Sequence, residues 1–414
     1  MVTPLPDNPE FLHAASQLIS GEATAASEQP YESLPLFQYK IERPVNILVM
    51  GVDRVPEAEV GSKDAFDGRT DTMLLLRFDP TDNTLRLLSL PRDTQVTVSG
   101  DPEVAKLNDA NTVGGAALAV KTTSAMLNDV PIDRYVRITN DSFRELVDLV
   151  GGVEVFVPKD MQYTDVTQGL EIDLDKGWQT LDGDQAEQFA RFRKDQYGDI
   201  GRVQRQQTLI KALRDRLQSP AILPRLPQAI RLMLRYVDTD LSFEEVLALV
   251  NFGMGLDAAE IQMVLLPGEF GDPQQFNGVS YWLMSAAGRD RVMNDYFDQA
   301  PPVGTNLQER APKQARIAIQ NATDDPNLGR QVVNYLAERG FNNVFFSEER
   351  APRLLETTEV IVQKGDLVAA AALQEALDLG KVQADSTGDL YSEITLRVGS
   401  DWLERAAAAA NEDD

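Results

Sequence analysis

The sequence contains no cysteine and only one histidine, His13, among its 414 residues. The absence of cysteine excludes disulfides, thiolate nucleophiles and cysteine-based metal sites. A single histidine in the N-terminal lead-in argues against a His-dependent catalytic triad and against a histidine metal site. Any chemistry must therefore come from Asp, Glu, Arg, Lys and hydroxyl groups. This set of side chains favours phosphate chemistry assisted by a hard cation that prefers oxygen ligands.

Long apolar runs and an excess of cations are also absent. No run of about 20 apolar residues occurs, so we expect no segment of this sequence to span a membrane. No secretory signal is visible either. The 39 Lys and Arg residues are outnumbered by 65 Asp and Glu residues, which gives a formal net charge of −26. Such acidity argues against non-specific binding to nucleic acid or to an anionic membrane surface.

The chain is long enough for two or three domains, each with its own core. Strands are predicted at 45–50, 73–78, 85–90, 135–138 and 153–157, and helices at 114–127 and 142–150. This alternation predicts an α/β fold in which a mixed central sheet is flanked by helices, with a smaller α/β domain at the C-terminus. The predicted parts are a lead-in (1–43), a main domain (44–298), a proline-rich linker (299–313), a C-terminal domain (314–404) and a tail (405–414).

Arginine and aspartate recur where three of the predicted strands begin or end. Asp53 follows the first strand, Arg69 and Asp71 introduce the second, and Arg92 and Asp93 follow the third. Ligand groups favour the carboxyl ends of strands in α/β sheets. We therefore interpret these side chains as a candidate site, and the alternative is a set of ion pairs at strand edges.

The segment 189–207 concentrates positive charge in an otherwise acidic chain. Arg191 and Arg193 are two residues apart, so both would point the same way in an extended chain. A helix is predicted from about Arg202 to Ser219, with Gln206 on its apolar stripe and Arg205 pointing away from it. Guanidinium forks suit phosphate oxygens, which favours a phosphate site. The alternative is a solvated surface of ion pairs.

Other nucleotide and hydrolase signatures are missing or misplaced. The Gly253-Met254-Gly255 triplet follows a predicted helix rather than a strand, so we reject it as a dinucleotide loop. The sequence has neither a Walker loop nor a Gly-x-Ser-x-Gly elbow. Residues 314–404 show no catalytic constellation, and the preceding linker predicts a separable, non-catalytic domain.

Several motifs in this order resemble the LytR-CpsA-Psr family over about 44–217, and the resemblance extends onward to about 300. The motifs are Gly51-Val52-Asp53, Arg69-Thr70-Asp71-Thr72, Leu90-Pro91-Arg92-Asp93, the 106–115 segment, Gly151-Gly152-Val153 and the 191–207 segment. Several ordered motifs are more specific than any single glycine pattern. Residues 316–402 resemble, more loosely, the C-terminal domain often appended to LytR-type members.

The resemblance implies an extracytoplasmic, membrane-anchored phosphotransferase that moves a glycopolymer from a polyprenyl-pyrophosphate carrier to peptidoglycan. By position, it implies that Asp53 and Asp71 hold Mg²⁺. It also implies that the pyrophosphate is bound by Arg69, Arg92, Arg191, Arg193 and Gln206. The acceptor hydroxyl must lose a proton, and Asp53, Asp71 and Asp93 are the candidate bases. The polyprenyl tail requires a long apolar cavity, which the helices at 114–127, 142–150 and 202–217 would line against the sheet.

Members of this family usually carry a transmembrane helix directly before the catalytic domain, and this sequence departs from the pattern there. We expect that an anchor has been removed. Three other functions compete with glycopolymer transfer: a pyrophosphatase that uses water as acceptor, a non-catalytic module that holds the lipid carrier, and transcriptional regulation through DNA. The acidity of the chain and the lack of a helix-turn-helix pattern argue against the last of these.

Overall fold

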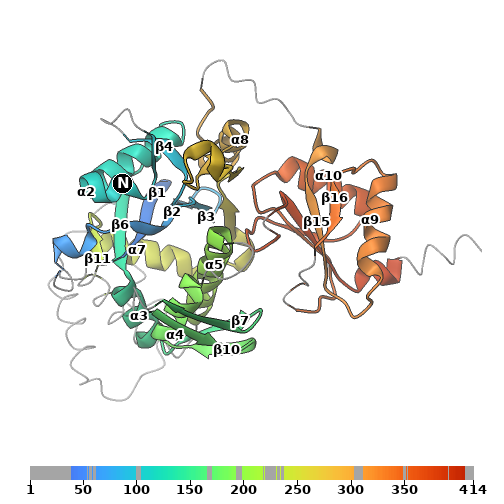
Figure 1. Ribbon diagram of the computed structural model, residues 1–414, viewed down its shortest axis with the longest axis horizontal. Helices are drawn as coiled ribbons and strands as arrows, with labels where there is room; N and C mark the ends of the chain where they lie inside the picture. Colours follow the sequence, from blue (N-terminus) through green and yellow to red (C-terminus); the bar gives the residue numbers. More distant parts are fainter. Residues whose placement is uncertain are drawn as a thin grey trace, which may run out of the picture.

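A computed structural model describes residues 39–405 of this chain. Gaps in the described residues fall at 54, 56–57, 59–61, 99–103, 166–169, 193–197, 218, 220–229, 231–233, 235–236, 303–310, 348–350, 352 and 390. Two α/β units follow one another along the chain (Figure 1). In the described part, no helix is both long enough and apolar enough to cross a membrane.

The first unit is built on a six-stranded mixed sheet in the order β11-β6-β1-β2-β3-β12. The strands are β1 (Val45–Val52), β2 (Thr70–Asp79), β3 (Thr84–Ser89), β6 (Arg134–Thr139), β11 (Val237–Thr239) and β12 (Ile261–Leu265). β1 pairs antiparallel with β2 and parallel with β6, and β3 pairs parallel with β12. The mixed sheet predicted from the sequence is confirmed.

Side chains alternate between the two faces of this sheet, so each face has a core of its own. On β1, Leu48, Met50 and Val52 face one cluster, while Val45 and Ile47 face another. The first face packs against α2 (Asp109–Met126) and α8 (Ala286–Phe297), and the second against α7 (Phe243–Met254). Because helices cover both faces, most of the central strands are buried.

A third hydrophobic core lies outside the six-stranded sheet and includes one long helix. It joins α3 (Asn140–Leu149), α4 (Gly183–Arg191) and α5 (Gly198–Leu217) to the pair β7 (Val153–Val157) and β10 (Gly177–Leu181). A further two-stranded pair, β8 (Met161–Asp165) with β9 (Leu170–Leu174), completes this region. Figure 1 shows α5 rising from this region toward the edge of the sheet that faces the second unit.

Local signals explain which element boundaries were predicted correctly. Ser242 with Glu245 has the spacing of a capping box and does begin α7, while α5 begins at Gly198, one turn before Arg202. Ser142 with Glu145 has the same spacing but does not begin α3, because Thr139 caps that helix and accepts from the Ser142 backbone N–H.

The sequence of 177–183 suggests a turn before the arginine-rich segment, but this interpretation is wrong. Residues 177–181 form β10 and pair with β7, and a capping box of Asp182 with Gln185 then begins α4. Helix α4 in turn replaces the extended chain predicted at Arg191, which is its last residue.

The second unit is a five-stranded sheet in the order β16-β15-β19-β17-β18, which packs against two helices. Its elements are β15 (Ile317–Asn321), α9 (Leu328–Glu338), β16 (Val344–Phe346), β17 (Glu359–Ile361), α10 (Leu367–Leu377), β18 (Lys381–Gln383) and β19 (Ile394–Val398). The smaller C-terminal α/β domain is thus confirmed, although the sequence reasoning missed β18. Its core holds Ile317, Leu336, Leu373 and Trp402.

The second unit joins the outer edge of β12. The Met263 backbone N–H donates to the Ala384 carbonyl, and the Leu265 N–H donates to the Gln363 carbonyl, each at 2.8 Å. An open sheet edge presents unpaired backbone groups that need partners. The C-terminal unit supplies partners to β12 at these two positions.

Candidate active site

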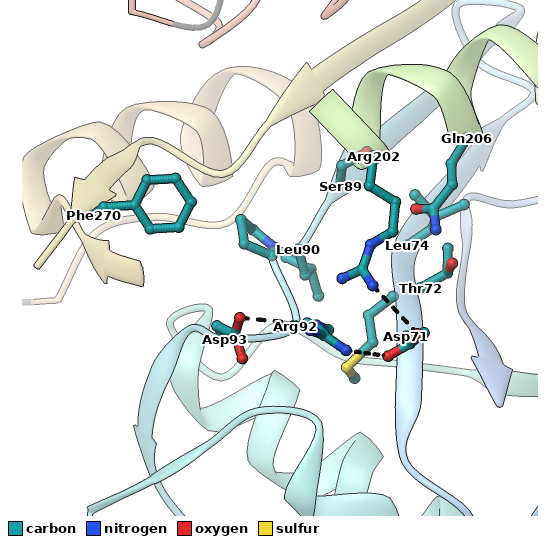
Figure 2. A pocket seen from close by; sticks show the side chains of 12 residues that line it. Asp71, Thr72, Leu74, Ser89, Leu90, Arg92, Asp93, Arg202, Gln206 and Phe270 are labelled. Atoms are coloured by element: carbon teal, nitrogen blue, oxygen red, sulfur yellow. Dashed lines mark hydrogen bonds and ion pairs between the residues drawn. The ribbon is translucent and has the colours of Figure 1, made fainter. Parts of the chain in front are cut away.

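A β-bulge places Asp71 at the end of the sheet. β1 and β2 are in register up to Gly51 opposite Thr72, but Val52 is opposite Thr70, so Asp71 is the extra residue on β2. A bulge bends its strand and changes the direction of the inserted side chain. Asp71 therefore lies among the side chains that line a small pocket, with Arg92, Asp93, Arg202 and Gln206 (Figure 2).

Two arginines converge on the Asp71 carboxylate. Arg92 Nη1 lies 2.5 Å from Asp71 Oδ1, and Arg202 Nη1 lies 3.3 Å from Asp71 Oδ2. The whole Arg202 residue is only 2 % exposed, and Figure 2 shows its side chain descending from α5 toward Asp71. A buried guanidinium needs a charged, hydrogen-bonding partner. Asp71 thus holds two guanidinium groups in the pocket, and guanidinium is the side-chain group best suited to bind oxyanions.

Asp93 fixes the other side of Arg92. The Asp93 carboxylate lies 2.7 Å from Lys106 Nζ and 3.8 Å from Arg92 Nε, and Asp93 is almost fully buried. A run of alternating charges therefore extends from Lys106 through Asp93, Arg92 and Asp71 to Arg202. Buried charges of this kind are stable only when each has an opposite partner.

Asp53 lies on the neighbouring strand end, close to the bulge. Its backbone N–H donates to the Arg69 carbonyl at 3.0 Å, and its Oδ1 accepts from Asn140 Nδ2 at 3.1 Å. Arg69 itself is at the rim, with a side chain 70 % exposed and 3.7 Å from Asp109. The structure therefore brings the carboxylates of Asp53 and Asp71 to adjacent strand ends, as the sequence predicted.

Gly68 sets the position of the chain that carries Asp53. A Cβ added at Gly68 would lie 1.8 Å from the Asp53 carbonyl oxygen, which is a backbone atom that cannot rotate away. We expect Gly68→Ala to displace Asp53 and to lower turnover by about 10²-fold, the cost typical of a 1 Å misplacement in a site. The measurement is kcat/KM beside the thermal midpoint.

Gly255→Ala is the matched control, because the Cβ it adds has ordinary contacts of 3.5 Å or more. Activity in Gly68→Ala equal to that of the control would show that the position of Asp53 does not matter.

One face of α5 continues from the pocket into an apolar cavity. Arg202 and Gln206 line the pocket, and Ile210, Leu213 and Leu217 line a cavity of about 810 Å³. These five residues are spaced four, four, three and four apart, so they share one face of the helix. Opposite them, Ser89 lines the pocket while Leu87 and Leu85 line the cavity, since alternate residues of β3 share a face.

The cavity differs in part from the one expected. Helix α3 contributes Leu146 and α5 contributes its apolar face, as predicted, but α2 contributes no lining residue among those described. Val250 and Met254 of α7 take that place. The reason is that α2 covers the opposite face of the sheet.

Arg202 is the site residue that the sequence reasoning missed. Its signal was present, because Arg202 precedes Gln206 by four residues on a predicted helix, and such residues lie side by side. Lys106, the partner of Asp93, and Asn140, the partner of Asp53, were also missed. Lys106 begins the 106–115 motif, which was noted without assigning it a role, and no local pattern marks Asn140.

Two arginines of the 189–207 segment lie in local surroundings that differ from those expected. Arg191 ends α4, donates to Glu187 at 2.9 Å and is not among the described residues lining the pocket. Arg205 points away from the stripe that carries Gln206, as predicted, but the face it lies on is also packed, and Arg205 is only 7 % exposed. Its guanidinium lies over the Phe192 ring and donates to the Phe192 carbonyl. Arg193 lies outside the described residues.

The donor set at the strand ends fits a hard cation. Asp53 and Asp71 offer oxygen ligands only, and Mg²⁺ keeps several of its waters, so two carboxylates suffice. Among the described residues, no group of three or more acidic side chains forms a complete protein cage for a metal.

The model of the LytR_cpsA_psr family matches residues 11–297. This chain belongs to that family. Residues 314–402 match a second model, described as LytR cell envelope-related transcriptional attenuator. The two matches fall on the two structural units.

Relatives of this LytR_cpsA_psr protein include named transferases. It is 32% identical over 273 residues to the polyisoprenyl-teichoic acid–peptidoglycan teichoic acid transferase TagV of Bacillus subtilis, a match that covers 64% of this chain and 67% of TagV. It is also 32% identical over 264 residues to the TagU transferase of Oceanobacillus iheyensis, covering 62% of this chain and 76% of that protein. The crystal structure of B. subtilis TagV superposes with a TM-score of 0.53 at 29% identity, covering 63% of this chain and all of that one.

Proposed function

We propose that this protein is a phosphotransferase that moves a glycopolymer from a polyprenyl-pyrophosphate carrier to a hydroxyl of peptidoglycan. The observation that carries the proposal is the single face of α5, on which a guanidinium and an amide are followed by three aliphatic side chains. From Arg202 to Leu217 this face extends about 22 Å at the rise of an α-helix. A ligand with an anionic head and a long apolar tail matches such a surface.

The arginines supply the charge that such a head requires. A pyrophosphate diester carries two negative charges, and more charge moves onto the leaving phosphate during transfer. Arg92 and Arg202 are held by Asp71, so they are already oriented before a substrate binds. Preorganised donors stabilise developing charge without reorganisation. Arg69 at the rim and Gln206 on α5 add donors, and Arg191 and Arg193 remain proposed contributors from the segment before α5.

The transfer conserves atoms and charge. The acceptor hydroxyl oxygen attacks the phosphorus that bears the glycan, a new P–O bond forms, and the bond to the bridging oxygen breaks. The lipid leaves as a monophosphate. The hydroxyl proton passes to a carboxylate, for which Asp53, Asp71 and Asp93 are the candidates. Mg²⁺ held by Asp53 and Asp71 would neutralise charge on the pyrophosphate oxygens.

The named activities of TagV and TagU support the choice of a lipid-linked glycan and a peptidoglycan acceptor. Those substrates are extracytoplasmic, so we propose that this protein works there, at the cell envelope, held by a membrane anchor preceding the catalytic unit. A net charge of −26 opposes binding to nucleic acid. This acidity counts against a role as a DNA-binding regulator.

The deciding experiment supplies a polyprenyl-pyrophosphate-linked glycan with and without peptidoglycan, in Mg²⁺ and in chelator. We expect release of polyprenyl monophosphate, and glycan attached to the wall, only when both Mg²⁺ and peptidoglycan are present. Equal release without peptidoglycan would identify a pyrophosphatase. Retained lipid with no release in any condition would identify a carrier-binding module.

A further inference from the structure

The apolar cavity is shared between the two units of the chain. Besides α5, α7 and the sheet, its lining includes Leu367 at the start of α10 and the stretch 381–385, which contains β18. The C-terminal unit therefore contributes surface to the cavity, on the side beyond β12. A unit that served only as a separate module would not need to reach this cavity.

Polar contacts hold this stretch of the C-terminal unit against α5. Gln204, Gln207 and Lys211 are spaced three and four residues apart, so they share a second face of the helix, next to the face that lines the cavity. Lys211 pairs with Asp385, the last cavity-lining residue of 381–385. Further contacts join Gln207 to Ser386, and Gln204 to the carbonyls of Ser386 and Gly388.

Asp385 is the buried partner of this pair, whereas the Lys211 side chain is 37 % exposed. Burial raises the pKa of Asp385, but the charge and hydrogen bond of Lys211, with the charge of Arg397 and the Thr387 backbone N–H, outweigh it and leave that pKa below the ordinary aspartate range. Removal of one partner from such a pair leaves an uncompensated buried charge, which is strongly destabilising. The pair therefore joins the wall of the cavity to the helix that carries Arg202 and Gln206.

A second set of contacts orients the C-terminal unit against α8. Arg291 Nη1 lies 2.6 Å from Asp366 Oδ2, and the same carboxylate caps α10 by accepting from the Ala369 N–H. Gly365, at φ +76°, passes so close to α8 that an added Cβ would lie 2.9 Å from Val292. Contacts at α5, β12 and α8 fix the unit at three separate places.

We infer that the C-terminal unit is part of the lipid site, with residues 381–385 forming the wall that limits the length of the polyprenyl chain. This inference rests on the proposed function for the identity of the occupant. The cavity is within the volume range of ligand sites, about 300 to 1,000 Å³. Gln383 lines this wall from an exposed position on β18, so a larger side chain there narrows the cavity without disturbing a core.

The wall is tested without any substrate by thiol labelling. The natural chain has no cysteine, so Leu213→Cys places a single reporter in the cavity lining. We expect Gln383→Trp to slow labelling of this thiol and Lys211→Met to speed it by about tenfold, because the unpaired Asp385 loosens the wall. The controls are Gln331→Trp on α9 and Lys121→Met on α2, two exposed positions outside the cavity.

The occupant is tested by binding of farnesyl pyrophosphate and undecaprenyl pyrophosphate to the full chain. We expect Gln383→Trp to weaken the long-chain lipid by about tenfold relative to Gln331→Trp, and to leave the short-chain lipid unchanged. Equal losses for both lipids, or none, would overturn the role in chain length.

The two tests fail separately. Labelling rates that respond to neither Gln383→Trp nor Lys211→Met would refute the assignment of residues 381–385 as a wall of the cavity, regardless of which ligand binds there. Labelling that responds as expected, in a protein that binds neither lipid, would leave the wall in place and refute the polyprenyl pyrophosphate as occupant, and with it the proposed function.

Discussion

Asp71→Asn is expected to lower kcat/KM for glycan transfer by about 10³-fold or more, the scale at which phosphoryl-transfer sites lose a charge-positioning group. The carboxylate holds Arg92 on one oxygen and Arg202 on the other. An amide of the same shape turns its NH₂ group toward one of these guanidiniums and replaces an attraction with a clash of donors. It also removes one of the two proposed Mg²⁺ ligands.

Asp298→Asn is the matched control, because Asp298 also pairs with a buried arginine, Arg77, but lies outside the pocket. Thermal midpoints separate a loss of chemistry from a loss of fold, and Arg92→Lys gives a second route if Asp71→Asn unfolds. Activity of Asp71→Asn within about threefold of the control would refute the role of Asp71.

The second large effect is expected at Arg202 of α5, and Arg205, three residues further along the helix, is its comparison. We expect Arg202→Lys to cost about 10³-fold in kcat/KM with a small change in thermal midpoint, since Lys retains the charge opposite Asp71 but loses the forked geometry. We expect Arg205→Lys to leave kcat/KM nearly unchanged and to lower the thermal midpoint. A lysine can keep the contact with the Phe192 ring or the hydrogen bond to the Phe192 carbonyl but not both, which lowers the free energy of unfolding by about 1.5–3 kcal/mol.

The measurements are kcat/KM and the thermal midpoint of Arg202→Lys and of Arg205→Lys. If Arg205→Lys were inactive and fully stable while Arg202→Lys stayed active, the assignment of the two faces of α5 would be reversed.

Short-range patterns predicted the sheet and its polar ends well. The apolar runs before Asp53 and after Asp71 specify β1 and β2, and the antiparallel pairing of these strands places both residues at adjacent strand ends. Gln206 was located correctly because a helical wheel places it on the stripe that packs inward. These predictions needed only the periodicity of one element at a time.

The local structure at Arg191 and the burial of Arg205 were not foreseen, and each has its own cause. Whether a helical face is exposed to solvent depends on what packs against it. Phe192 packs against the face of α5 that carries Arg205, which a helical wheel alone does not show. Arg191 was expected in an extended chain, but the capping box of Asp182 with Gln185 begins a helix that ends at Arg191. A tertiary contact therefore explains the burial of Arg205, and a local signal explains the helix at Arg191.

The role of the C-terminal unit was also beyond the reach of local patterns. A proline-rich linker predicts independence, but the contacts of Lys211 with Asp385 and of Arg291 with Asp366 connect residues far apart in the sequence. A chain that ends at Asp298 would lack the partners of β12 and the cavity wall formed by 381–385, so we expect its turnover to fall below that of the full chain.

The bonds at β12 also bear on how the protein folds during synthesis. Domains generally fold as units from the N-terminus onward, so the six-stranded sheet can assemble before residues 363 and 384 leave the ribosome. During that interval β12 is an unpaired edge, which is a template for pairing with other chains. The late arrival of the C-terminal unit makes the newly synthesised protein prone to aggregation until its last segment has docked.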